Sequence, residues 1–145
     1  MSFTIFGIVQ GRLTQSPPGC LQWFPQESWQ DEYVTASDIG INYIELIAEV
    51  QHNPENPIWT DAGISKIKQL VKKNDLTLHA LCNDYIVEHS FLDEDVIQQN
   101  IDLIEQEKKL GIEKYIMPFF ESSELSADNM QDYIEPLKRV AKVAY

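Results

Sequence analysis

Seven polar side chains lie within, or just beyond, four short apolar segments of the chain. They are Gln10, Arg12, Glu45, His79, Asp84, Tyr85 and Glu121. An amide, a guanidinium, three carboxyls, an imidazole and a phenol together offer both hydrogen-bond donors and acceptors. A polyhydroxylated substrate needs both kinds of partner, so the set predicts a pocket for such a molecule.

Most of these residues also have a structural interpretation, and the sequence leaves both open. Arg12 could pair with a carboxylate of its own loop. Glu45 and His79 stand inside apolar segments, so each points either toward a site or toward packed helices. A buried carboxylate is costly without a partner or a ligand, and a lone strand histidine is often a hydrogen-bonded core residue. Asp84 and Tyr85 directly follow a predicted strand, where either role is open.

The elements that would position these residues recur along the chain. Nearly continuous apolar runs predict strands at 3–9, 42–48, 76–82 and 113–119, so a unit repeats about every 35 to 40 residues. Helical spacing predicts helices at 27–39, from Thr60 or Asp61 onward, at 94–110 ending at Gly111, and in a last segment that Pro136 starts or kinks. The chain is thus one partial domain of four units, approximately 1–40, 41–75, 76–111 and 112–145.

Strands that alternate with amphipathic helices predict an α/β fold with a parallel sheet and right-handed crossovers. A doubly wound sheet is the alternative, but no GxGxxG or phosphate-binding loop follows the first strand. Long polar loops follow the strands, as in (β/α)8 barrels. A complete TIM barrel needs about 250 residues, so these 145 residues predict its N-terminal half. Four strands do not close a barrel, hence either a fragment or pairing with a second copy is expected.

The charge and cysteine content of the chain limit the kinds of partner and site that can be expected. The 23 acidic and 11 basic residues give a net charge of −12, which disfavours nucleic acid and anionic membranes. Cys20 and Cys82 form no CxxC pair, so neither a disulfide framework nor a thiolate zinc site is expected. No signal peptide and no apolar run of about 20 residues is present, which predicts a soluble cytoplasmic protein.

Several segments together resemble one family. They are GIVQGRL at 7–13, LQWFPQESWQDEY at 21–33, GINYIELIAE at 40–49, LHALCNDYIVEHSF at 78–91 and YIMPFFESSEL at 115–125. In order and spacing they resemble the N-terminal half of the xylose isomerase-like TIM-barrel proteins, the sugar phosphate isomerases/epimerases.

The resemblance implies a metal-dependent isomerase or epimerase that moves a proton through an enediolate, using Mn, Mg, Zn or Co. By that analogy the seven residues line the pocket for a sugar or sugar phosphate. The family's metal ligands and proton-transfer glutamates come from strands five to eight. No catalytic residue and no metal ligand is therefore predicted here, and the chain alone is expected to be inactive.

Two alternatives stay open. One is a non-catalytic half-barrel module that completes itself by homodimerisation, whereas the other is an endonuclease-type TIM barrel. The second requires a basic rim for DNA, which the net charge of −12 disfavours. The expected partners are thus a small sugar or sugar phosphate and either a homo-oligomer mate or a missing C-terminal half.

Overall fold

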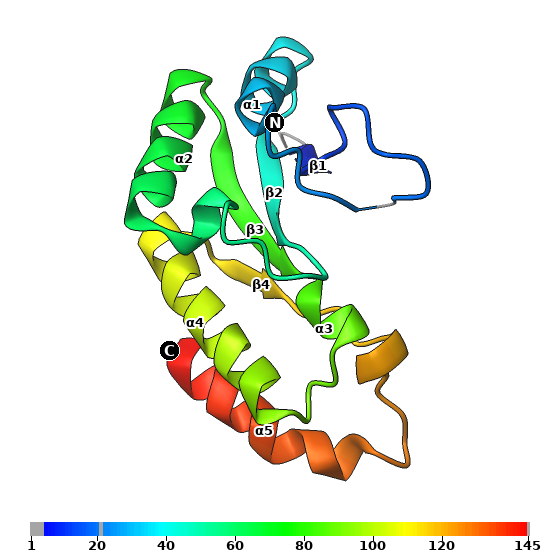
Figure 1. Cartoon of the computed structure of the whole chain (residues 1–145). Coiled ribbons are helices and arrows are strands. Elements are labelled where there is room, and N and C mark those ends of the chain that lie inside the picture. The colour runs from blue at the N-terminus through cyan, green and yellow to red at the C-terminus, as the bar shows by residue number, and fades with distance from the viewer. Residues whose placement is uncertain (1–4, 21, 145) are drawn as a thin grey trace.

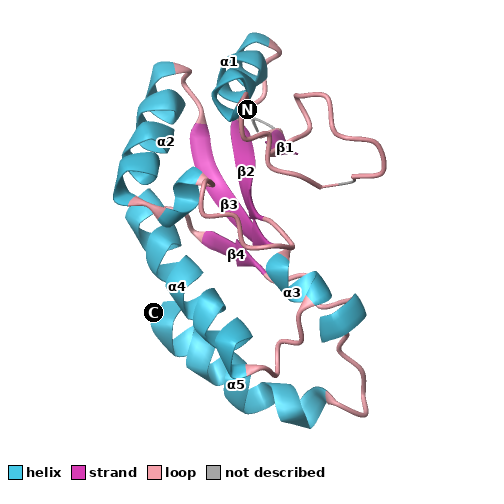
Figure 2. Ribbon diagram, viewed as in Figure 1, coloured by secondary structure: helices cyan, strands magenta, loops and turns pink. Residues whose placement is uncertain are grey.

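The structure is a computed structural model that describes residues 5–20 and 22–144. Strands and helices alternate along the chain (Figures 1 and 2). The strands are β1 (Gly7–Val9), β2 (Tyr43–Ala48), β3 (Thr77–Asn83) and β4 (Lys114–Ile116); the helices are α1 (Trp29–Asp38), α2 (Asp61–Lys73), α3 (Tyr85–Glu88), α4 (Glu94–Leu110) and α5 (Met130–Ala144), with 3₁₀ turns η1 (Pro57–Trp59) and η2 (Glu121–Ser123). The predicted α/β class, with four strands interleaved with helices, is confirmed.

The strands form one parallel sheet in the order β1-β2-β3-β4. A doubly wound sheet would reverse its strand order at a switch point, and this sheet has no such reversal. Right-handed crossovers that always step in the same direction put their helices on the same face. In Figure 1, α2 and α4 run along the same side of the sheet. The topology is that of half a β/α barrel.

The residues of β2 alternate between the core face of the sheet and the opposite face. Ile44, Leu46 and Ala48 are buried in the core that also contains Tyr33 of α1 and Ile67 of α2. Since side chains alternate along a strand, the residues between them point to the opposite face. That opposite face is not covered by the helices, so it is the face on which a site can form.

Two helices begin or end at the residues that the sequence predicts. Thr60 caps α2, because its hydroxyl accepts a 3.0 Å hydrogen bond from the Gly63 N–H. Gly111 ends α4 at φ +76°, a left-handed conformation that favours glycine. Pro136 lies inside α5, which begins six residues earlier at Met130, so the expectation that it starts the main helical segment is wrong.

Other differences concern the strand ends and short helices. β4 stops at Ile116 rather than at residue 119, and Pro118 lacks the N–H that a longer strand would use. The start of the first predicted strand, residues 3 and 4, lies outside the described residues. The turns η1 and η2 and the short helix α3 were not predicted. In the part of the chain that the structure describes, no helix is both long enough and apolar enough to cross a membrane.

Candidate functional site

Two carboxyls and an imidazole interact on the sheet face that the helices leave uncovered. Burial raises the pKa of Glu45, and the nearby Asp84 carboxylate raises it further while His79 opposes the rise. The His79 ring packs against Tyr43, with 5.0 Å between the ring centroids. Tyr43 and Glu45 are alternate residues of β2, so both belong to this face. The structure thus brings together Glu45 of β2 with His79 and Asp84, which lie in and just after β3. The sequence analysis predicts all three as site residues.

Asp84 is held at the end of β3. Its backbone N–H donates to the Ala48 carbonyl over 2.9 Å, which fixes it beside the end of β2. Its Oδ1 accepts a hydrogen bond from the Cys82 thiol over 3.3 Å, while its Oδ2 is buried without a hydrogen-bond partner among the described residues. A buried carboxylate oxygen without a donor is costly, so it is a natural acceptor for a bound ligand.

The pKa of Asp84 reports the same environment. Burial raises the pKa of this carboxyl, whereas the Cys82 hydrogen bond and the Arg12 guanidinium lower it and the Glu49 carboxylate raises it. Asp84 also lines a cavity of about 190 Å³ whose other walls include Val50, Val87 and Phe120. Apolar walls weaken solvent screening, which strengthens any hydrogen bond or ion pair that Asp84 makes there.

Gln10 is fixed at the end of β1. Its backbone N–H donates to the Glu45 carbonyl over 2.9 Å, and its side-chain Oε1 accepts from the Ile47 N–H over 3.4 Å. The side chain is buried, and its Nε2 has no hydrogen-bond partner among the described residues. Gln10 therefore has an unused donor, as Asp84 has an unused acceptor.

Glu32 of α1, which is not among the residues that the sequence predicts for the site, positions the loop that follows β1. Its carboxylate accepts from the Gly11 N–H at 2.9 Å, the Leu13 N–H at 3.0 Å and the Thr14 hydroxyl at 3.2 Å. Burial raises the pKa of Glu32, although the two backbone hydrogen bonds lower it. The bonded residues flank Arg12, so Glu32 fixes the segment that carries this guanidinium.

A sequence signal for Glu32 existed. It lies three residues after Trp29 and four before Ala36, on the apolar stripe of α1, and it is only 1% exposed. A carboxyl on a buried helix face must find donors, because burial of an unpaired charge is too costly. The first residues of the polar loop after β1 supply those donors.

Glu49 orders the next loop. Asn53 Nδ2 and Asn56 Nδ2 each donate to its carboxylate over 2.7 Å. Asn56 also donates to the Ile47 carbonyl over 3.0 Å, which ties the loop to the end of β2. Since Glu49 also acts on the pKa of Asp84, this loop forms one border of the site.

Among the described residues, no side-chain hydrogen bond or ring contact joins Tyr85 or Glu121 to Glu45, His79 or Asp84. The Tyr85 ring stacks on His89, with 3.8 Å between centroids and 6° between planes, and packs against the apolar cluster to which α3, α4 and α5 contribute. Glu121 is exposed and begins η2 at φ +52°. The main causes of the pKa shifts of Glu45 and Asp84 are other groups. Their roles as substrate contacts stay predictions.

The chemistry of the site is that of binding through hydrogen bonds. Within residues 5–20 and 22–144, no three His, Cys, Asp or Glu side chains are grouped so as to hold a metal ion. Arg12 supplies positive charge at the exposed border, while Glu45 and Asp84 supply acceptors, or a donor when one of them is protonated. Such a set can hold a hydroxylated molecule that carries an anionic group.

Comparison of the sequence with models of known protein families gives no match, and comparison with curated proteins gives none either.

Proposed function

We propose that this chain is the substrate-binding half of a (β/α)8 barrel of the sugar isomerase/epimerase type. The observation that carries the proposal is the convergence of Glu45, His79 and Asp84 on the uncovered face of a singly wound parallel sheet. In barrels the ends of the strands and the loops beyond them carry the site. Two neighbouring carboxyls with raised pKa values are typical of functional clefts.

Each residue has a distinct task in this proposal. The buried Oδ2 of Asp84 accepts a hydrogen bond from a substrate hydroxyl, and Gln10 Nε2 donates to a substrate oxygen. The exposed Arg12 binds an anionic group such as a phosphate, which its forked guanidinium suits. Glu45 forms a second contact with a substrate hydroxyl, and His79 favours its charged form by lowering its pKa.

The described residues do not fit a metal site, so no step through a metal is assigned to them. The family resemblance places the metal ligands and the proton-transfer glutamates on strands that this sequence does not contain. The chain by itself is therefore proposed to bind a sugar without converting it.

Titration of the ¹⁵N-labelled chain with aldoses, ketoses and their phosphates tests the proposal. Amide shift changes should gather around residues 10–12, 45, 79 and 84, and Asp84→Asn should weaken binding about tenfold, as for loss of a charge-assisted hydrogen bond. Asp132→Asn, which removes one negative charge from an exposed position of α5 just as Asp84→Asn removes one from the site, should leave binding unchanged. In D₂O the sugar should keep its C–H hydrogens. Binding elsewhere on the surface, or none at all, would refute the assignment.

A second candidate is a half-barrel that pairs with a second copy of itself. Ile5 and Phe6, just before β1, are 67% and 61% exposed, and Ile116 of β4 is 37% exposed. In the described sheet β1 and β4 are the two edges, and both run in the same direction. Two such sheets joined edge to edge would give eight parallel strands, the number of a closed barrel. The molar mass in solution distinguishes this candidate from the first.

A further inference from the structure

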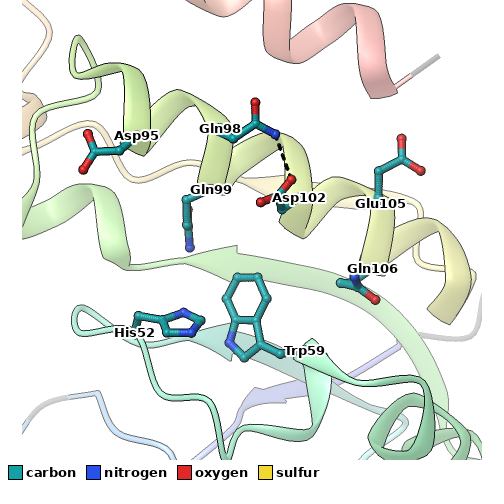
Figure 3. A pocket seen from close by; sticks show the side chains of 8 residues that line it. All are labelled: His52, Trp59, Asp95, Gln98, Gln99, Asp102, Glu105 and Gln106. Atoms are coloured by element: carbon teal, nitrogen blue, oxygen red, sulfur yellow. Dashed lines mark hydrogen bonds between the residues drawn. The ribbon is translucent and has the colours of Figure 1, made fainter.

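Two hollows of the molecule differ in the burial of their walls. The larger, of about 480 Å³, lies between Trp59 and helix α4, and Figure 3 shows the polar side chains of α4 that line it. None of the described side chains in its wall is buried, and Gln98 already donates to Asp102 over 2.8 Å. The smaller hollow, of about 190 Å³, is lined by Asp84 and has buried residues in its wall. We call it the Asp84 cavity.

The Asp84 cavity takes at least one residue from the segment that follows each strand. Gln22 follows β1, Val50 follows β2, Asp84 and Val87 follow β3, and Phe120 follows β4. The carboxyl ends of parallel strands meet at the same edge of a sheet, and barrels bind their substrates at that edge. The cavity therefore lies where the fold places a substrate.

Hydrogen bonds hold the walls of this cavity. The Val87 N–H donates to the Asp84 carbonyl over 3.0 Å, so both residues belong to one turn. On the other side the Ser123 hydroxyl donates to the His89 carbonyl over 2.9 Å, which joins η2 to the segment after α3. Phe120 directly precedes η2 and is positioned with it. The walls are thus formed before a ligand arrives, which lowers the cost of binding.

The walls are mainly apolar, and they contain one buried acceptor. Val50, Val87 and Phe120 supply the apolar surface, whereas Asp84 is only 4% exposed and its Oδ2 has no donor among the described residues. Gln22 is exposed, so its amide stays in contact with water. A hydroxyl that entered beside the apolar side chains would lose its hydrogen bonds to water without replacement, whereas a methyl group would gain by burial.

We propose that the Asp84 cavity binds the methyl end of a deoxy sugar, whose neighbouring hydroxyl donates to Oδ2 of Asp84; this inference rests on the proposed function. The methyl group packs between Val50, Val87 and Phe120. The Glu49 carboxylate also acts on Asp84, and two neighbouring negative charges disfavour a phosphate at this end of the substrate.

Titration of the ¹⁵N-labelled chain with matched pairs of sugars tests the proposal. The pairs are L-fucose with L-galactose, L-rhamnose with L-mannose, and 6-deoxy-D-glucose with D-glucose, and the members of each pair differ by a single hydroxyl. In the pair whose configuration fits, the deoxy sugar should bind about tenfold more tightly, as for one group in an apolar pocket. Its amide shift changes should include residues 50, 84, 87 and 120.

Val50→Thr places a hydroxyl in the cavity wall at nearly the same side-chain shape. It gives the additional hydroxyl of the hexose a partner, so the preference for the deoxy sugar should fall from about tenfold to about threefold. Val34→Thr, the same substitution at an exposed position of α1, is the control and should keep the full preference. Circular dichroism of both variants verifies that the fold is intact.

The outcomes separate this inference from the proposed function. Equal affinity within every pair, with shift changes around residues 10–12, 45 and 84, would overturn the deoxy-sugar assignment and leave the proposed function in place. A full preference retained by Val50→Thr would also overturn it, because the cavity wall would then not select the methyl group. Binding of none of the six sugars would overturn both.

Discussion

The thiol of Cys82 donates to Oδ1 of Asp84 over 3.3 Å, two residues farther along the chain. Burial raises the pKa of this thiol, and the Asp84 carboxylate raises it further. Cys82 therefore stays protonated and remains a donor at neutral pH. The bond satisfies one carboxyl oxygen of Asp84 and leaves the other for a ligand, so Cys82 positions the central acceptor of the proposed site.

Cys82→Ala should raise the pKa of Asp84, because the hydrogen bond that lowers it is lost. Cys82→Ser supplies a hydroxyl donor and should keep the pKa close to that of the unmodified protein. Titration of the Asp84 side-chain carbon by ¹³C NMR measures both. A pKa that is the same in the alanine and serine variants would mean that the thiol does not act on this carboxyl.

Glu32→Gln should destabilise the fold by about 2 kcal/mol, since an amide oxygen replaces a carboxylate that three donors share. The amide NH₂ also faces backbone N–H groups, which cannot accept a hydrogen bond. Denaturant unfolding measures the change. Asp31→Asn, the exposed neighbour on α1, is the matched control and should shift the free energy of unfolding by less than about 0.5 kcal/mol. Equal effects of the two substitutions would contradict the role of Glu32.

Much of the fold could be predicted because apolar spacing and helix-ending residues indicate the same elements that the structure contains. Helix α4 spans Glu94–Leu110 as predicted, since its apolar spacing is regular and Gly111 ends it. The length of β4 and the turns η1 and η2 could not be predicted, because they depend on pairing and on loop packing rather than on apolar periodicity.

The site was harder to predict because it depends on strand register. Ile44 pairs with Leu78 but Leu46 pairs with Leu81, so β3 carries one more residue than β2 between these pairs. Such an irregularity changes which side chains share a face. No periodicity in the sequence could therefore tell whether His79 lies beside Glu45. The role of Glu32 depends on a contact between a helix and a loop 18 to 21 residues away, which apolar patterns do not encode.

Glu107 should make stability depend on pH. Burial in α4 raises the pKa of this carboxyl from 4.5 to about 7. Between these values the folded state keeps a proton that the unfolded state has lost, so the free energy of unfolding falls as pH rises from about 4.5 to 7 and then levels off. At about 1.4 kcal/mol per pKa unit, a rise from 4.5 to about 7 sets an upper limit of roughly 3 to 4 kcal/mol on this loss, and solvent screening lowers it.

Glu107→Gln removes this titration and should increase the free energy of unfolding above pH 7, measured by denaturant unfolding at several pH values. The slope should decrease without vanishing, because burial also raises the pKa of Glu32, Glu45 and Asp84. Glu105→Gln, an exposed position on the same helix, serves as the control. An unchanged slope in the Glu107 variant would show that this carboxyl ionises freely in the folded protein.

Ile116→Asp tests whether the β4 edge joins a second copy of the chain. Ile116 pairs in register with Cys82 of β3 and so shares the uncovered face of the sheet. If that face closes an eight-stranded barrel between two copies, a buried carboxylate there should dissociate the dimer. Light scattering after size-exclusion chromatography should then give the mass of a dimer for the unmodified chain and of a monomer for Ile116→Asp. Val34→Asp, which alters an exposed apolar residue of α1, should leave the dimer intact. A monomeric unmodified chain would exclude pairing through this edge and leave the substrate-binding half-barrel as the remaining candidate.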